Sequence, residues 1–594
     1  MVGTQLKMTT VGSFHAAADA LRNGCTALDL RPAHQDPDDT FRNALFTYGH
    51  QLTEISFYLQ PRYFGDWCVN LRRLCVTNAR FDDEFISKCA HLEHLCITSQ
   101  DKLQNIAHCP KLESLDIYAS EFMDICIARC KNLRSLTVRQ ITDAEHLYQL
   151  SNIMHYCPTI TTLRLVFTYE IDNMSMDDLL AKCAHLRVFS ITGSYSSWEL
   201  SPYLPRFTAL EELTMECFDE GIYKLPKLRK LTIHRTLDAS INFSLLPSLE
   251  ELDISGVLCN LDMSSIRESM TALRAVLSNI YSVGSLAKCT HMTELRLMCT
   301  TNNYSCKRLA NALTNMKQLR VLVIEQSHMG CDDVTAIAKQ LPASLTHFST
   351  AGTVIGELGT KHLTAALAKM KGIEILDLSQ SIFCRKAAKY LARGFQRWPN
   401  LVSLTINYAN LDDDLCLLMA KQLHHCKKLE VLSLKGNCMG TTASHALALA
   451  MADFTRLRQV YMPMCDTIAE VLPVHGSQMT LDFGDFGSRN DAEISAFVTK
   501  LGGHAPVCVN VVLEDRATVD VIGRHLPFLH PESSINDGGA TILGWFFWQR
   551  RRYIHASLFA FMNAENSKCA AGDFVRRDGD RAILHRVALW LVPV

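Results

Sequence analysis

Apolar and polar positions follow one repeated pattern from Leu345 to Phe454. The copies begin at Leu345, Ile373, Leu401 and Leu429, so the period is 28 residues. Each copy opens with apolar residues at its first and fourth positions and later carries apolar residues three and four positions apart. The opening predicts a short strand, and the later spacing predicts an amphipathic helix. A strand and a helix repeated at a fixed interval predict a solenoid, because each unit buries its apolar face against its neighbours.

The same opening recurs upstream, at intervals that vary between 18 and 27 residues. The shorter intervals leave room for a turn or a short helix, whereas the longer ones hold a helix of about two to three turns. One unit is imperfect, because a frame that begins at Leu273 places Ser278 where an apolar residue belongs. The upstream units start at Leu52, Leu71, Leu92, Leu112, Leu133, Ile160, Leu186, Leu210, Leu228, Leu249, Leu273, Met292 and Leu319.

These repeats resemble the leucine-rich repeat superfamily. The period, the Leu-x-x-Leu-x-Leu opening at Leu429 and the Asn437 at the ninth position of that repeat are similar to the ribonuclease-inhibitor-like form. The segment from Cys109 to Ile117, Cys-x-x-Leu-x-x-Leu-x-Ile, is similar to the cysteine-containing repeats of F-box substrate adaptors. The resemblance implies an α/β leucine-rich repeat solenoid, a curved horseshoe with a parallel sheet on the concave face and helices or turns on the convex face.

The resemblance implies binding of a protein partner. F-box adaptors capture substrates for ubiquitin ligases, so one hypothesis is a substrate-recognition subunit that contacts a ubiquitin ligase adaptor subunit. The Leu-Pro-led helical pattern of an F-box is absent from residues 1–50. The regular repeats after Leu319 are similar instead to the sensor half of nucleotide-binding immune receptors, or to inhibitors and GTPase regulators of ribonuclease-inhibitor type. The sequence leaves both hypotheses open.

We expect four segments along the chain. Residues 1–50 are weakly patterned and are expected to form an N-terminal cap with a degenerate first repeat, because a stack needs a polar end. Residues 51–485 form the solenoid, and residues 486–537 hold degenerate repeats. Residues 538–594 contain three of the six Trp residues and a run of three arginines. We interpret them as a C-terminal cap over the last repeat, with docking to a partner or a membrane surface as the alternative.

Charge and hydropathy indicate which partners and which cellular location to expect. A net charge of −2 argues against a protein that wraps nucleic acid. Residues 1–20 lack the basic segment, apolar run and cleavage site of a secretory signal. The longest aromatic and apolar run, residues 541–548, is shorter than the roughly 20 residues of a membrane helix. We therefore expect a cytoplasmic protein whose partner is another protein, with no nucleic acid and no membrane contact.

The chain has 23 cysteines and no Cys-x-x-Cys pair. Eight of them stand three residues before a repeat start, in a slot that other repeats fill with Phe, Leu, Met or Trp. We predict that these thiols are small buried hydrophobic groups and bind no metal. Cys75 and Cys96 share an outward strand position in adjacent repeats, so we expect them to be near neighbours with reduced thiols. The eight slot cysteines are Cys68, Cys89, Cys109, Cys130, Cys157, Cys183, Cys289 and Cys426.

No motif in the sequence predicts an enzyme or a cofactor site. The segment from Gly356 to Lys361 has the wrong spacing for a phosphate-binding loop. The tripeptide at 482–484 matches a kinase metal-binding motif, but the other kinase motifs are absent. We predict a non-enzymatic protein with no cofactor and no metal. The alternative, an enzyme, would require a concave pocket with paired titratable groups of shifted pKa.

The surface made by the strands is the candidate binding site. Alternate strand residues point away from the core onto the concave face. In the first five repeats this face mixes Tyr, Arg and acidic side chains, which suits a folded protein partner, whereas between Leu319 and Leu434 it becomes smaller and more apolar. Tyr and Arg side chains dominate binding energy at interfaces. We therefore predict that the partner contacts Tyr58, Arg73, His94, Asp116, Tyr118, Arg139 and Arg164.

Overall fold

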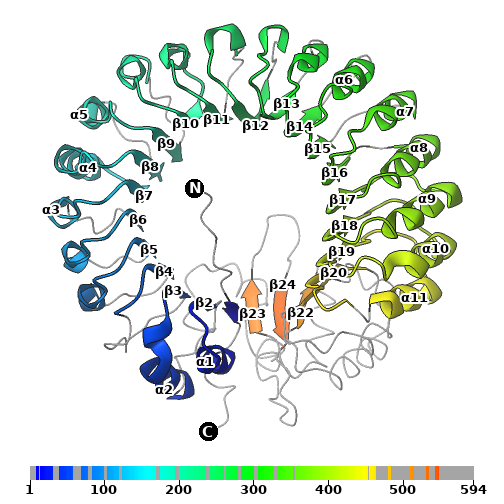
Figure 1. Cartoon of the computed structure of the whole chain (residues 1–594), viewed down its shortest axis with the longest axis horizontal. Coiled ribbons are helices and arrows are strands. Elements are labelled where there is room, and N and C mark those ends of the chain that lie inside the picture. Colours follow the sequence, from blue (N-terminus) through cyan, green and yellow to red (C-terminus); the bar gives the residue numbers. More distant parts are fainter. Residues whose placement is uncertain are drawn as a thin grey trace, which may run out of the picture. The chain divides into compact units, whose positions relative to one another are not determined.

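The computed structural model divides the chain into two compact units, Met1–Met270 and Thr271–Val594, called unit 1 and unit 2. Within each unit the strands form one layer and the helices form a second layer on one side of it (Figure 1). The structure describes residues 9–11, 14–30, 39–57, 69–77, 83–98, 104–118, 124–168, 174–193, 200–235, 241–259, 263–277, 283–299, 306–325, 329, 331–351, 353, 355–451, 454–462, 479–482, 509–513, 530–533 and 542–546.

Unit 1 contains a parallel sheet in which consecutive strands pair in register. The connection between two parallel neighbours must cross back over one face of the sheet, which places the outer elements on that face. The strands are β1 (Thr9–Val11), β2 (Ala27–Leu30), β3 (Glu54–Phe57), β4 (Arg73–Thr77), β5 (His94–Thr98), β6 (Ser114–Tyr118), β7 (Ser135–Ile141), β8 (Thr162–Phe167), β9 (Val188–Gly193), β10 (Glu212–Cys217), β11 (Lys230–Arg235) and β12 (Glu251–Cys259).

The outer layer of unit 1 follows the length of each repeat. Short repeats carry 3-10 helices, whereas the longer repeat after β7 carries α4, whose first turn is capped by Asp143 through a 3.1 Å bond from the His146 backbone N–H. The outer elements are α1 (Phe14–Arg22), α2 (Asp39–Tyr48), α3 (Asp124–Ile127), α4 (Ala144–Tyr156), α5 (Met174–Lys182), η1 (Gly49–Gln51), η3 (Asp83–Lys88), η4 (Asn105–His108), η6 (Leu204–Arg206), η7 (Glu220–Lys224), η8 (Phe243–Leu245) and η9 (Met263–Ser265).

Unit 2 continues the same alternation with longer outer helices. Its strands are β13 (Ala272–Leu277), β14 (Glu294–Cys299), β15 (Val321–Glu325), β16 (His347–Ser349), β17 (Ile375–Asp377), β18 (Ser403–Thr405), β19 (Val431–Ser433), β20 (Gln459–Tyr461), β21 (Met479–Asp482), β22 (Val509–Leu513), β23 (His530–Ser533) and β24 (Ile542–Phe546). Its outer elements are η10 (Val283–Lys288), α6 (Cys306–Leu313), α7 (Cys331–Gln340), α8 (Glu357–Leu367), α9 (Arg385–Phe395), α10 (Asp413–Leu423) and α11 (Thr441–Met451).

The apolar frame of the repeats forms the core. Leu429, Leu432 and Leu434 open one repeat, and all three side chains are fully buried. Leu447 and Met451, from helix α11 of the same repeat, are buried as well. Strand and helix therefore supply opposite walls of one apolar layer, as the 28-residue pattern predicted. The predicted α/β solenoid is confirmed.

The cysteine slot is part of this core. The Cys109 thiol lies 3.6 Å from the Ile86 carbonyl oxygen of the preceding repeat. Burial raises the pKa of Cys89 and of Cys130 to about 12, so both thiols are protonated at neutral pH. The predicted structural role is confirmed for the slot cysteines among the described residues, whereas Cys68 lies outside that set. The buried slot cysteines are Cys89, Cys109, Cys130, Cys157, Cys183, Cys289 and Cys426.

Two buried polar side chains join neighbouring repeats of unit 2. The Asn437 amide donates to the Ile406 and Leu434 carbonyl oxygens at 2.6 and 2.9 Å. Its carbonyl oxygen accepts the backbone N–H groups of Ala409 and Leu411 at 2.9 and 3.1 Å. One side chain thus satisfies four backbone groups that the turns after the strands would otherwise leave unpaired.

The second is the Trp398 indole, which is completely buried and donates to the Met370 carbonyl oxygen at 3.0 Å. The Phe395 ring meets it edge to face, with centroids 5.9 Å apart. A Cβ added at Gly394 would lie 2.3 Å from the indole. Glycine is therefore required at this point of α9 for the ring to pack against the helix.

The repeat frame at Leu273 corrects one prediction. Leu273 pairs in register with Leu295, which is the fourth position of the repeat that starts at Met292. Leu273 is therefore also a fourth position, and its repeat starts at Met270. Ser278, which the sequence frame placed at a defective core position, does not belong to the apolar frame and lies outside the described residues.

The last described strands depart from the repeat. β21 and β22 pair in parallel, but β24 pairs antiparallel with both β22 and β23. The rest of the predicted tail, residues 538–541 and 547–594, lies outside the described residues. The four predicted segment boundaries remain predictions.

Candidate functional site

Alternate strand residues make an open face, defined as the sheet surface turned away from the outer helices. In β6, Leu115 and Ile117 are buried against the helices, whereas Ser114, Asp116 and Tyr118 are partly exposed on the other side. Strands β3 to β9 pair in register, except for a shift between β7 and β8 after Val138, so equivalent open-face residues form columns that run across the repeats. Such columns offer side chains at the strand spacing of roughly 4.8 Å.

Asp116 and Arg139 form the best-defined contact on this face. The Arg139 Nε and one terminal nitrogen donate to the two carboxylate oxygens of Asp116 at 2.7 and 2.8 Å. These hydrogen bonds raise the pKa of Arg139, despite the opposing effect of burial. A two-pronged contact of this kind holds the guanidinium plane in one orientation. Tyr118, the register neighbour of Arg139, lies beside it.

Arg73 and His94 lie next to each other at the starts of β4 and β5. The Arg73 Nε is 3.7 Å from the Glu54 carboxylate on β3. Burial, followed by the positive charge of Arg73, lowers the pKa of His94, so its imidazole is neutral at pH 7. This end of the face therefore presents a cation, a carboxylate and a neutral ring in adjacent repeats.

The other predicted residues are less closely grouped. Arg164 is exposed on β8 and is the register partner of Thr137, which places it in the column of Asp116, one strand beyond Arg139 on β7. Tyr58 lies outside the described residues. The structure thus brings Asp116, Tyr118 and Arg139 together and places Arg73 and His94 as a separate pair.

Cys75 and Cys96 occupy the second open-face column. They are register partners on β4 and β5, and both thiols are free of disulfide bonds. A hydrogen bond with Cys75, together with burial, raises the pKa of Cys96. The predicted proximity of Cys75 and Cys96 is confirmed.

A charged cluster in unit 2 was only partly predicted. The Nε and one terminal nitrogen of Arg274 each donate to the Glu294 carboxylate at 2.7 Å, and the Arg296 Nε donates to the same carboxylate at 2.5 Å. Although burial opposes it, this double pairing lowers the pKa of Glu294 to about 2. The repeat frame that starts at Met292 places Glu294 and Arg296 on the open face, whereas the frame that starts at Leu273, which is three residues too late, does not place Arg274 there.

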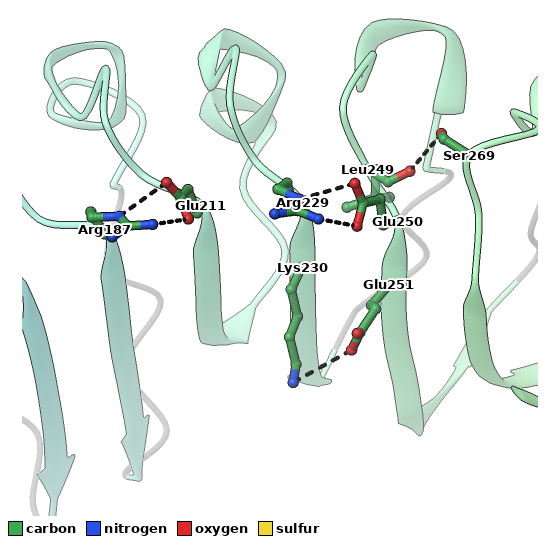
Figure 2. Close-up of polar contacts among 8 residues, drawn as sticks. All are labelled: Arg187, Glu211, Arg229, Lys230, Leu249, Glu250, Glu251 and Ser269. Carbon is green, nitrogen blue, oxygen red and sulfur yellow. Dashed lines mark hydrogen bonds and ion pairs between the residues drawn. The ribbon is translucent and has the colours of Figure 1, made fainter. Parts of the chain in front are cut away.

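A further row of charges lies at the strand starts of unit 1. This strand-start row consists of the residue that follows the first apolar position of each repeat. Arg187 pairs with Glu211 and Arg229 with Glu250, with closest distances of 2.7 and 2.6 Å (Figure 2). Lys230 and Glu251, on the open face below, form a looser pair at 3.5 Å. Neighbouring repeats of unit 1 are therefore linked by surface ion pairs.

The described residues show no grouping of three or more His, Cys, Asp or Glu side chains suited to a metal ion. Among the helices that the structure describes, none combines the length and apolar character needed to cross a membrane.

Comparison with known proteins adds one sequence match. No protein-family model matches the chain. The Mus musculus protein "NACHT, LRR and PYD domains-containing protein 14" is 22% identical over 309 residues, which cover 50% of this chain and 29% of that protein. The chain thus matches less than a third of the length of this relative.

A solved internalin, inlF from Listeria monocytogenes str. 4b F2365, is 16% identical, with a TM-score of 0.35 over 60% of this chain and 88% of that chain. The in-register parallel strands with outer helices, the buried apolar frame and the mouse sequence match agree with the pattern in the sequence. The chain is a member of the leucine-rich repeat superfamily.

Proposed function

We propose that this protein is a non-catalytic scaffold that binds a protein partner on the open face of β4 to β8. The observation that carries the proposal is the Asp116–Arg139 pair, which is held by two hydrogen bonds on a partly exposed sheet surface beside Tyr118. Such a rigid group loses little side-chain freedom when a partner binds. Leucine-rich repeats in the mouse relative support a binding role.

The chemistry of this face favours a folded protein over a polyanion. Arg73, Arg139 and Arg164 alternate with Glu54 and Asp116, so the surface carries both signs of charge. A nucleic acid backbone would be repelled by the carboxylates, whereas a protein surface can match both signs. Exposed Arg and Tyr side chains are the residue types that contribute most at protein interfaces.

The sequence match favours one more specific hypothesis about the role of the chain. The relative combines leucine-rich repeats with NACHT and PYD domains, as its name states. This match supports the hypothesis that the chain acts as the sensor or regulatory part of a receptor of that general type. The link to a ubiquitin ligase and the cytoplasmic location stay predictions, and recovery of a cullin-linked adaptor with the purified chain would test the first of them.

A capture experiment with matched variants tests the open face. The full chain and the variant Tyr118→Ala/Arg164→Ala are each used to capture proteins, which are identified by quantitative mass spectrometry. The control variant is Arg187→Ala/Arg229→Ala, which removes two arginines from the strand-start row. We expect a specific partner that is lost with the open-face variant and kept with the control. A partner that both variants retain equally would contradict the proposed surface.

A further inference from the structure

The helix ends of unit 2 carry a concentrated positive charge. We define the basic edge as six exposed side chains at the C-terminal ends of α8, α9 and α10 and in the turns that lead into β17, β18 and β19. Over the whole chain acidic and basic residues nearly balance, with 59 Lys and Arg against 61 Asp and Glu. The basic edge consists of Lys371, Arg393, Arg397, Lys421, Lys427 and Lys428.

These side chains lie on one continuous surface. Helix α9 packs between α8 and α10. Gln396, after the end of α9, donates to the Gln422 side chain of α10 at 2.7 Å. Lys428 donates to the Asn400 side chain of the preceding turn at 2.7 Å. Because the repeats keep a 28-residue period, Arg393 and Lys421 occupy the same position on successive helices.

Among the residues that the structure describes, none of the six side chains of this edge forms an ion pair. Unit 1 differs, because Arg187 and Arg229 are paired with glutamates of the next repeat. The helix dipole accounts for a basic residue in the last turn, such as Lys421. It does not account for Lys427 and Lys428, which lie beyond the end of α10 at Leu423.

We propose that the basic edge binds a short acidic segment of a protein partner. This inference rests on the proposed function as a protein-binding scaffold and assigns a second contact to it. Unpaired lysines and arginines, spaced across three repeats and separated by the amides of Gln396, Gln422 and Asn400, match alternating carboxylates and peptide groups. The segment need only span three repeats.

One observation favours a protein over a nucleic acid. Glu374 and Glu430, which each follow the first apolar position of a repeat, lie beside the edge, where they would repel a phosphate backbone that continued along the repeats. An acidic segment of limited length avoids this repulsion.

The test compares two variants that lose the same charge. The edge variant is Lys371→Gln/Arg397→Gln/Lys427→Gln/Lys428→Gln, and the control is Arg72→Gln/Arg134→Gln/Arg187→Gln/Arg229→Gln in the strand-start row. Each full chain is titrated, by fluorescence anisotropy, into a labelled Glu-rich peptide, a single-stranded RNA and vesicles that contain phosphatidylserine. Circular dichroism checks that all chains are folded.

We expect the edge variant to bind the peptide at least about tenfold more weakly than the unmodified chain, because several exposed ion pairs each contribute a little. The control should retain the affinity, and added salt should weaken binding. Equal loss in both variants, no peptide binding, or preferential binding of RNA or vesicles would overturn the inference. If the partner captured through Tyr118 and Arg164 still binds the edge variant with full affinity, the inference fails while the proposed function stands.

Discussion

The two units join neighbouring repeats by different means. In unit 1, arginines of the strand-start row pair with glutamates of the next repeat at the surface, as Arg187 does with Glu211. Unit 2 has a similar ion pair near its start, between Arg274 and Glu294, but in its 28-residue repeats the buried side chains of Asn437 and Trp398 cross between neighbours instead. Exposed ion pairs contribute little to stability, whereas a buried group with several partners contributes more. Where buried side chains hold neighbouring repeats together, surface charges are not needed for that purpose and remain available for binding. The side chains of the basic edge are of this kind.

Removal of the buried indole should produce the largest effect. Trp398→Ala deletes a fully buried ring and its bond to the Met370 carbonyl, so we expect unit 2 to lose about 3–5 kcal/mol of unfolding free energy. Urea denaturation followed by circular dichroism measures the loss. A change below about 1 kcal/mol would show that internal contacts do not hold these repeats together.

The amide of Asn437 comes next. Asn437→Ala leaves four backbone groups without their partner, and we expect a loss of about 2–4 kcal/mol. The matched control is Ser381→Ala, at the same position of the repeat that starts at Ile373. The Ser381 hydroxyl is buried and has no hydrogen-bond partner among the described residues, so its removal should be neutral or slightly stabilising. Equal losses in the two variants would argue against the hydrogen-bond explanation.

The charged cluster of unit 2 predicts an acid-sensitive contribution. The pKa of Glu294 is about 2, below its usual value of 4.5, because Arg274 and Arg296 pair with it. A lowered pKa gives stability that is complete above about pH 4.5 and is lost as the pH falls towards 2. Allowing for solvent at a partly exposed cluster, we expect about 1–2 kcal/mol.

Glu294→Gln should remove this part of the pH dependence. Urea midpoints measured at pH 6 and at about pH 3 would test it, with Glu250→Gln as the comparison in unit 1. The prediction fails if both variants lose the same stability at pH 6 and keep the same dependence of stability on pH as the unmodified chain. In that case the pairing of Glu294 contributes no more to stability than the exposed pair of Glu250.

Disruption of a surface pair in unit 1 should have the smallest effect. Arg229→Gln removes the contact with Glu250, which is exposed to solvent and screened by salt. We expect no measurable shift of the urea midpoint at physiological ionic strength. A loss as large as that of Asn437→Ala would remove the difference between the two units.

The fold was largely predictable from the sequence. Leu429, Leu432 and Leu434 are buried as their spacing indicated. When apolar residues recur at fixed positions of every repeat, only one orientation of the strand turns all of them towards the helices. The frame at Leu273 was wrong, since Met270 was assigned to the cysteine slot, where apolar residues are equally common. Periodicity alone could not separate two apolar positions three residues apart.

The candidate site was less predictable. Alternation along β6 correctly placed Asp116 and Tyr118 on the open face. It could not show that Asp116 would pair with Arg139, because that contact depends on side-chain conformations and on the neighbouring strand. The basic edge escaped notice for a related reason. Lys427 and Lys428 become notable only once the structure shows that, among the described residues, no carboxylate pairs with them.

The buried slot cysteines can report the local opening of the individual repeats that contain them. A thiol such as Cys130 or Cys426, with its pKa raised to about 12 by burial, reacts with an alkylating reagent only while its own repeat is open. Pulsed alkylation read by mass spectrometry would therefore give the opening frequency of individual repeats along both units without any engineered label.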